Sequence, residues 1–211
     1  GAVSRGEISA ERIEESYGRI TDLKKQIRHT RPNLSVVGCS EHREKELEIA
    51  RSAVTVVRDD AGTIPLRVSR KVLVVVPTTT LSAAEDPSLD KGNPGYYIRR
   101  YHKNTRVIEV RSDPGFEDTR KVAGEAASSE VVIIFTQRGD RNAGQIALAK
   151  TISRMGKPVI AVSMDVPYDL AELADVGTCI AIYGRRDCNM QALADVLFGR
   201  VEPTGVLPVS L

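Results

Sequence analysis

The stretch Ser129–Leu170 decides the fold of this chain. It begins with SEVVIIFT (Ser129–Thr136), continues with the polar segment QRGDRNAG (Gln137–Gly144) and an amphipathic run, and then reads GKPVIAVS (Gly156–Ser163). The two apolar runs show no polar alternation, which is typical of strands covered on both faces of a parallel sheet. The residues between them that recur at helical spacing are Ile146, Leu148, Ala149 and Ile152. The stretch therefore predicts a βαβ unit, with the loop Thr136–Gly144 at the carboxyl end of its first strand.

The alternation of strand and helix extends outward from this unit. Further strands are predicted at Val54–Val57, Val72–Pro77, Val107–Val110 and Cys179–Ile182. Further helices are predicted to begin at Ser40 and Pro94 and to cover Phe116–Ala127, Tyr168–Leu173 and Asn189–Phe198. This order predicts an α/β fold, a three-layer doubly wound sandwich whose mostly parallel sheet of five or six strands carries helices on both faces.

Two connections in the first half of the chain are less regular. After the turn Asp59–Gly62, the residues Ile64–Leu66 are expected to form a strand that ends or lies at a sheet edge, because Pro65 has no N–H to donate. The polar segment Thr78–Asp90 is long enough to fold over a cleft, and Asn93 is expected to cap the next helix.

A long helix precedes the predicted sandwich. Ser9 is expected to be its N-cap, and the apolar stripe that follows consists of Ile13, Tyr17, Ile20, Leu23 and Ile27. This stripe either packs across the outside of the same domain or belongs to a neighbouring domain outside this sequence. Because the chain lacks a starting Met, we expect it to be a piece of a longer protein. We predict a linker helix and connector in residues 1–38, followed by the α/β sandwich in residues 39–211.

Composition and charge argue against two classes of partner. The 211 residues are 41% hydrophobic, which suffices for one sizeable core. The net charge is only +2, Trp is absent and 4% of residues are aromatic, whereas a nucleic-acid binder would show a basic face with stacking side chains. No apolar run approaches the roughly 20 residues needed to span a bilayer. We expect neither nucleic acid nor a membrane as a partner.

The cysteines give a weak indication of the cellular compartment. Cys39, Cys179 and Cys188 are an odd number without metal-ligand spacing, and Cys179 is expected to be a small core residue. We expect no signal peptide. A reducing compartment is the default for such a pattern, so we expect a cytoplasmic location, with secretion of the longer protein as the open alternative.

No motif for metal, cofactor or triad chemistry is present. A Gly-x-Gly-x-x-Gly run after a strand and a Gly-Lys-Ser/Thr triplet are both absent, and Gly139–Gly144 supplies two glycines without the tight turn. The isolated histidines, expected at the surface, are His29, His42 and His102. Residues Asp86–Asp90 lack the spacing of a calcium loop, and no Gly-x-Ser-x-Gly elbow occurs. We therefore expect no metal and no cofactor.

The loop Thr136–Gly144 holds the remaining candidates for ligand contact. Guanidinium and carboxylate groups beside glycines suit polyhydroxylated ligands, and open α/β sheets bind ligands at the carboxyl ends of their strands. The candidate residues are Arg138, Asp140, Arg141 and Asn142. The alternative is a solvated loop in which Asp140 or Asn142 caps the following helix.

Several short phrases, taken together and in order, are more informative than any single site. They are ARSAVTVVRD (Ala50–Asp59) followed by Ile64–Leu66, GKPVI (Gly156–Ile160), VPYDL (Val166–Leu170), Tyr183–Gly184, ALADVLFG (Ala192–Gly199) and PTGVLPV (Pro203–Val209). The series resembles the carboxyl-terminal domain of glycoside hydrolase family 3 along nearly the whole chain. VPYDL is similar to the Asn-Pro-Tyr-Asp-Leu phrase of the β-N-acetylglucosaminidase branch, with Val166 where that branch usually has Asn. Ile8–Ile13 resembles the helix that leaves the family's catalytic barrel.

The resemblance implies an accessory domain without catalytic residues of its own. In the family, the nucleophilic Asp lies in an amino-terminal (β/α)8 barrel, and the acetylglucosaminidase branch adds an acid/base His in a Lys-His-Phe-Pro-Gly-His-Gly loop of that barrel. Neither motif occurs in this sequence. Some β-glucosidase branches take an acid/base Glu from a loop whose counterpart here is Thr136–Asn142, which contains Asp140 but no Glu. No catalytic residue is therefore carried over.

Three functions remain open on the sequence. The first is the accessory domain of a glycosidase that hydrolyses terminal β-linked N-acetylhexosamine, with the amino-terminal barrel of the same polypeptide and an amino-sugar glycoside as partners. Such a domain is inactive without the barrel, which supplies the paired groups of the double-displacement mechanism. The alternatives are a β-glucosidase-type family 3 domain and a non-catalytic carbohydrate-binding or interaction module.

Overall fold

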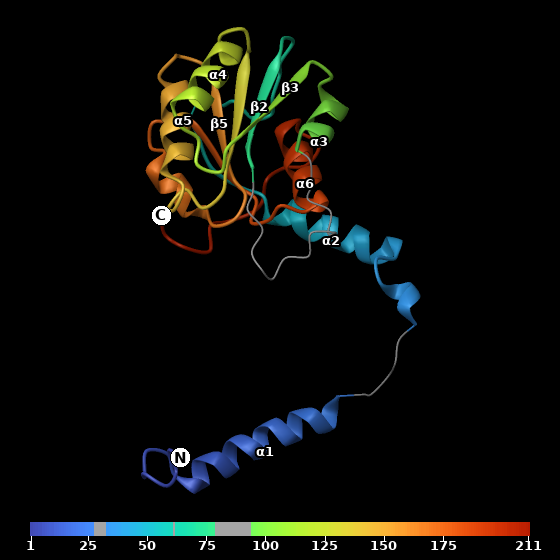
Figure 1. The fold of residues 1–211 in the computed structure, drawn as a ribbon. Coiled ribbons are helices and arrows are strands. Elements are labelled where there is room, and N and C mark those ends of the chain that lie inside the picture. Colours follow the sequence, from blue (N-terminus) through green and yellow to red (C-terminus); the bar gives the residue numbers. More distant parts are fainter. Residues whose placement is uncertain (28–32, 61, 79–93) are drawn as a thin grey trace. The chain divides into compact units, whose positions relative to one another are not determined.

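The computed structural model describes residues 1–27, 33–60, 62–78 and 94–211 (Figure 1). The chain separates into two compact units, Gly1–Cys39 and Ser40–Leu211. Within the described ranges, no helix is long and apolar enough to cross a membrane. The expectations for His29, for residues 79–90 and for Asn93 as a helix cap lie outside the described residues.

The first unit contains the predicted amino-terminal helix. Helix α1 covers Ala10–Gln26, and Ser9 is its N-cap, with its hydroxyl oxygen accepting from the N–H of Arg12 at 3.1 Å. No residue of α1 is buried, and its apolar stripe is exposed, from 49% at Ile13 to 67% at Tyr17. A short 3-10 helix, η1, follows at Leu34–Val36. The predicted start of the helix is confirmed, and what its stripe packs against stays a prediction.

The second unit is built on one six-stranded sheet. Its strands are β1 (Thr55–Asp59), β2 (Val72–Pro77), β3 (Thr105–Val110), β4 (Val131–Thr136), β5 (Val159–Ser163) and β6 (Thr178–Ala181). The order across the sheet is β1-β6-β5-β4-β2-β3, with β1 antiparallel to β6 and all other neighbours parallel. The helical elements are α2 (Ser40–Ala53), α3 (Pro94–Tyr101), α4 (Phe116–Ala127), α5 (Ala143–Ser153), η2 (Pro167–Glu172) and α6 (Asp187–Leu197). The predicted fold class is confirmed.

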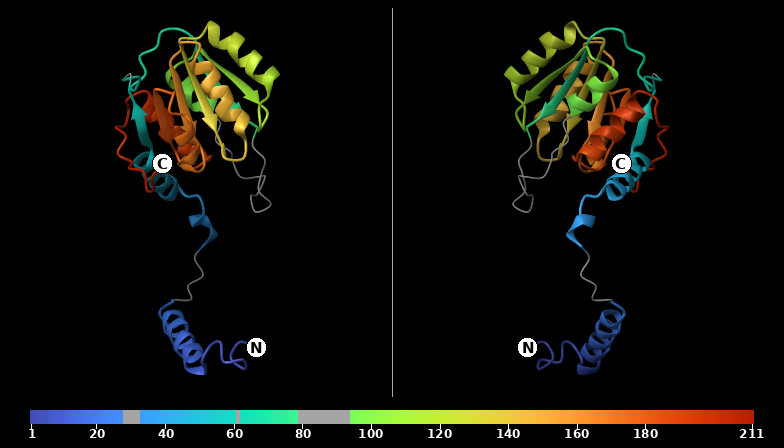
Figure 2. Two further views of the ribbon diagram at one scale, coloured as in Figure 1. Left: turned by 90° about the vertical axis from the view of Figure 1, so that its left-hand side faces the viewer. Right: turned by 90° about the vertical axis from the view of Figure 1, so that its right-hand side faces the viewer.

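The helices cover both faces of this sheet. Helices α4 and α5 lie on one face, while α2, α3 and α6 lie on the other (Figures 1 and 2). Successive strand residues alternate between the two cores, so that Ile133 and Phe135 of β4 pack on the α6 side and Val132 and Ile134 on the α5 side. Each central strand is thus buried on both faces, which explains the absence of polar alternation in its sequence.

The residues that follow β1 do not form the strand that the sequence suggested. The N–H groups of Thr63 and Ile64 donate to the carboxylate of Asp59 at 2.8 and 3.0 Å, and the N–H of Leu66 donates to the carbonyl of Leu197 at 2.7 Å. The N–H groups of this segment are therefore bonded to the Asp59 side chain and to the last residue of α6, and not to a neighbouring strand. Pro65 has no N–H group to donate. The expectation of a strand at Ile64–Leu66 is therefore wrong.

Candidate functional site

The carboxyl ends of the parallel strands bring four connections to one edge of the sheet. Among the described residues, these connections follow β3, β4, β5 and β6, and their edge is the lower one in Figure 2. Beyond β2 the chain moves outward to β3, whereas β4, β5 and β6 continue in the opposite direction. The strand order therefore reverses between β2 and β4, which is where ligands bind in open α/β sheets. The loop after β4 borders this point.

This loop, Gln137–Asn142, is called the rim loop below. Arg138 has a positive φ of 53°, and its guanidinium donates to both oxygens of Asp140, at 3.0 and 2.8 Å. These bonds from Arg138 hold the pKa of Asp140 below its ordinary value. Arg141 lies 3.9 Å from the same carboxylate and keeps 75% of its side chain exposed. The loop thus presents one neutralised ion pair and one exposed guanidinium.

Helix α5 is capped from another loop, contrary to the alternative considered above. Asn142 occupies the N-cap position without a side-chain cap bond, and its Nδ2 instead donates to the carbonyls of Gln137 and Arg138 at 3.2 and 3.1 Å. The N–H of Gly144 donates to Asp113 Oδ1 at 2.8 Å. Asp140 is engaged with Arg138, so neither of the two expected residues caps the helix.

Two glycines and a glutamine fix how closely the edge loops approach one another. A Cβ on Gly144 would lie 2.2 Å from the carbonyl oxygen of Pro114, so the helix start and the loop after β3 are in direct backbone contact. Gln145 is buried, accepts from the N–H of Gln137 at 2.7 Å and donates to the carbonyl of Ser112 at 2.5 Å. Gly144 therefore serves close packing between the two loops, and Gly139 does the same, since a Cβ there would lie 2.8 Å from Cδ1 of Ile146.

Sequence reasoning missed the role of Asp169, which lies in η2 after β5. Its side chain is 1% exposed, and its Oδ1 accepts from the N–H of Gly139 at 2.7 Å. By geometry, neither Oδ2 nor the buried hydroxyl of Thr136 has a hydrogen-bond partner among the described residues, although the Thr136 hydroxyl and the N–H of Asp140 lie close enough to favour the charged carboxylate. Burial raises the pKa of Asp169 above its ordinary value. The available signal was an acidic residue in the VPYDL phrase, directly after a buried strand.

The rim loop has groups for binding, but the two carboxylates that lie in it or against it are engaged or buried. All four predicted contact residues lie in or next to one loop, yet the Asp140 carboxylate is bonded to Arg138 and the Asp169 carboxylate is buried. Glycoside hydrolysis needs two accessible carboxyl groups, or equivalents, on either side of the bond.

In the described ranges, no group of three or more His, Cys, Asp or Glu side chains is arranged to hold a metal ion. His102, one of the histidines expected at the surface, is half-buried, and its Nε2 lies 2.6 Å from the carbonyl oxygen of Arg70.

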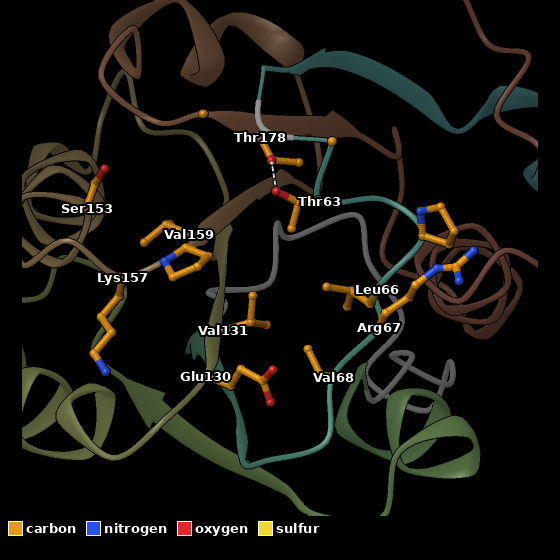
Figure 3. A pocket seen from close by; sticks show the side chains of 14 residues that line it. Thr63, Leu66, Arg67, Val68, Glu130, Val131, Ser153, Lys157, Val159 and Thr178 are labelled. Carbon is orange, nitrogen blue, oxygen red and sulfur yellow. Dashed lines mark hydrogen bonds between the residues drawn. The ribbon is translucent and has the colours of Figure 1, made fainter.

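A hollow lies at the opposite, amino edge of the sheet (Figure 3). It encloses about 550 Å³ between the loop Gly62–Val68 and the first residues of β4, β5 and β6. Its main polar groups are bonded within the protein. Glu130 accepts from two backbone N–H groups at 2.7 and 3.0 Å, Lys157 donates to two carbonyls at 2.9 and 3.2 Å, and the Thr178 hydroxyl donates to Asp59 at 2.8 Å and lies 3.1 Å from the Thr63 hydroxyl. We therefore place the candidate site at the carboxyl edge.

Comparison with known proteins decides the family. The model of the glycosyl hydrolase family 3 C-terminal domain matches residues 34–211. The chain belongs to this family. A curated relative, Beta-hexosaminidase A of Pseudoalteromonas piscicida, is 24% identical over 249 residues, and the match covers the whole chain and 40% of the relative. The resemblance seen in the sequence is confirmed, and this relative supports the β-N-acetylglucosaminidase branch.

Solved structures of two glycosidases share the fold. A family 3 β-N-acetylglucosaminidase from Paenibacillus sp. str. FPU-7 has a TM-score of 0.76 at 25% identity, over 98% of this chain and 41% of that one. A β-glucosidase from Listeria innocua has a TM-score of 0.67 at 18% identity, over 95% of this chain and 32% of that one, and so supports the fold alone. The chain spans about 40% of the length of the hexosaminidase and acetylglucosaminidase relatives.

Proposed function

We propose that this family 3 domain is the accessory carboxyl-terminal part of an enzyme that hydrolyses terminal β-linked N-acetylhexosamine. The observation that carries the proposal is the match of the whole chain to a hexosaminidase and to a β-N-acetylglucosaminidase, at 24% and 25% identity. Both relatives are more than twice as long as the matched region. The nucleophile and the acid/base group are assigned to an amino-terminal (β/α)8 barrel on the same polypeptide.

The contribution of this domain is a binding rim. Arg138, Asp140, Arg141 and Asn142 lie at the carboxyl edge beside the reversal of strand order. The exposed, planar guanidinium of Arg141 suits paired sugar hydroxyls, and the Arg138–Asp140 pair offers further donors and acceptors at a fixed spacing. The rim loop contacts the amino sugar, and the barrel performs the chemistry.

The test compares two substrates on the complete polypeptide. Its kcat/KM for 4-nitrophenyl N-acetyl-β-D-glucosaminide is expected to exceed that for 4-nitrophenyl β-D-glucopyranoside, while residues 1–211 alone release no nitrophenol from either. A preference for the glucoside would move the protein to the β-glucosidase branch. Release of nitrophenol from neither substrate would contradict the glycosidase assignment.

A carbohydrate-binding module that works without a barrel is the second candidate. The observation that favours it is that the two carboxylates nearest the rim loop are engaged or buried, since Asp140 is bonded to Arg138 and Asp169 is 1% exposed. Calorimetric titration of residues 1–211 with chitooligosaccharides separates the two candidates. Saturable heat from the isolated chain supports the module, and its absence leaves the accessory domain as the better account.

We also propose a cytoplasmic location and no nucleic-acid or membrane partner. Cys39, Cys179 and Cys188 are free thiols, and Cys179 is buried in the core beside Arg58. Burial and Glu46 raise the pKa of Cys188 to about 11, so its thiolate is not populated near neutral pH. Fractionation of cells that produce the complete polypeptide tests the location.

A further inference from the structure

The carboxylate of Asp169 forms the support on which the rim loop rests. It reaches the loop from η2, and its Oδ1 accepts from the N–H of Gly139 at 2.7 Å. A Cβ on Gly139 would lie 3.1 Å from both Cγ and Oδ1 of Asp169 and 2.8 Å from Cδ1 of Ile146. The loop backbone therefore lies directly on the carboxyl group and on helix α5, with no room for a side chain between them.

Stabilisation of the fold does not account for this carboxylate. Asp169 is 1% exposed and forms no ion pair within 4.0 Å among the described residues, and its Oδ2 lacks a hydrogen-bond partner there. Burying a carboxyl group with only part of its hydrogen bonds made costs stability. An arrangement that costs stability yet fixes one backbone N–H is typical of residues that orient a functional loop.

The backbone that Asp169 fixes determines where the rim side chains point. Gly139 lies between Arg138, whose φ of 53° is a conformation that favours glycine, and Asp140, to which Arg138 donates two hydrogen bonds. Turning the Arg138–Gly139 peptide would break the bond to Asp169 and redirect both members of the ion pair. Thus one buried acceptor holds a strained residue and its partner in place.

We propose that Asp169 is a positioning residue, which holds the rim loop in the shape that presents Arg138, Asp140 and Arg141 to the sugar. This inference rests on the proposed function for its substrate and on the structure alone for its effect on the loop. Asp169 takes no part in bond cleavage, because its carboxylate is buried beneath the loop.

The first experiment measures the loop in residues 1–211 without any substrate. We expect Asp169→Ala to raise the hydrogen-exchange rate of the Gly139 amide at least tenfold relative to the Ile133 amide in β4. Asp169→Asn keeps an oxygen acceptor for Gly139 and places its amide beside the Thr136 hydroxyl, so it is expected to restore protection. Asp165→Ala, an exposed neighbour in the same connection, is the matched control and leaves the rate unchanged. Unchanged exchange of Gly139 in Asp169→Ala overturns the inference.

A second variant approaches the same contact from the other side. Gly139→Ala leaves Asp169 intact but inserts a methyl group between the loop and the carboxyl group. It is expected to accelerate exchange at residues 138–140 as Asp169→Ala does. If Asp169→Ala fails to fold, this variant decides, and normal protection of the residue 139 amide in it overturns the inference.

The second experiment measures the kinetics of the complete polypeptide on the N-acetylglucosaminide. Asp169→Ala is expected to raise KM about tenfold with kcat changed less than twofold, and Asp169→Asn to restore KM, because a displaced rim weakens binding without touching the reacting groups. Active enzyme with unchanged KM in Asp169→Ala overturns the inference and leaves the proposed function intact. An inactive wild type contradicts the proposed function instead, and the exchange of Gly139 then decides the inference.

Discussion

At the scale of single residues, Arg138 combines a costly backbone with a useful side chain. Its φ of 53° favours glycine, and its guanidinium pairs with Asp140 at the surface, where such pairs add little stability. We expect Arg138→Gly to have a folding equilibrium constant roughly fivefold or more above that of Arg138→Ala, because both lose the pair but only glycine relieves the strain. Urea unfolding of the two variants provides the comparison. Equal stability would mean that the position is unstrained.

The raised pKa of Asp169 predicts that the stability of the protein depends on pH. Because burial raises its pKa, the folded protein holds the Asp169 proton more tightly than the unfolded chain does. Its favourable contribution is complete below the unfolded pKa of about 3.9 and is lost as the pH rises through the higher folded value. The unfolding free energy of the wild type minus that of Asp169→Asn should therefore fall as the pH rises from about 4 toward neutral, since Asn does not titrate. Urea unfolding across this range measures the difference, and a rise with pH would contradict the assignment.

At the scale of elements, the contact between α5 and the loop after β3 depends on Gly144. A methyl group there would lie 2.2 Å from the carbonyl oxygen of Pro114, so Gly144→Ala must separate the two and weaken the bond to Asp113. We expect a loss of about 1–3 kcal/mol in unfolding free energy. Gly124→Ala is the matched control, because Gly124 lies on the exposed side of α4 with no atom near its missing Cβ. That change should stabilise the protein by about 0.5–1 kcal/mol, and chemical denaturation compares the pair.

The ALADVLFG phrase forms a buried junction between three helices. Asp195 of α6 is 1% exposed and accepts from Arg51 of α2 at 2.6 and 2.8 Å and from the hydroxyl of Tyr101 of α3. We expect Asp195→Ala to cost about 3–5 kcal/mol, because it leaves two donors without their acceptor. Asp175→Ala removes an exposed partner of Arg154 and should change stability by less than about 1 kcal/mol. Similar losses in the two variants would contradict a structural role for the junction.

These elements show which features the sequence was able to predict. The bounds of α4 match the prediction, Phe116–Ala127, because a helix start and its apolar period depend on neighbouring residues. The cap of α5 and the support of the rim loop were missed. Asp113 is 31 residues from Gly144, and Asp169 is 30 residues from Gly139, so both contacts exist only once the strands have aligned. For the same reason, the sequence showed that Gly139 and Gly144 lack the spacing of a nucleotide-binding turn but not that they serve close contacts between loops.

At the scale of the whole molecule, stability is concentrated in the second unit. Every buried hydrophobic residue among the described ones lies between Ala50 and Leu197, and α1 contributes none. The carboxyl end of the chain, in contrast, belongs to this unit and contacts the residues at the start of its first strand: the N–H of Gly205 donates to the carbonyl of Val54 at 3.2 Å, and a Cβ on Gly205 would lie 2.6 Å from that oxygen. The two ends of the chain therefore make unequal contributions to the stability of the sandwich.

Deletion of each end tests this difference. Removal of residues 1–39 is expected to change the midpoint of thermal unfolding by less than about 2 °C, because no core side chain is lost, and 1 kcal/mol corresponds to about 2–4 °C in a domain of this size. Removal of residues 203–211 uncovers the start of β1 and breaks the bond from Gly205, so we expect a fall of several degrees. Differential scanning calorimetry of the two truncated chains and the full chain measures both shifts. A larger fall on removal of the amino-terminal unit would mean that α1 supports the sandwich, and that its apolar stripe is not reserved for another part of a longer polypeptide.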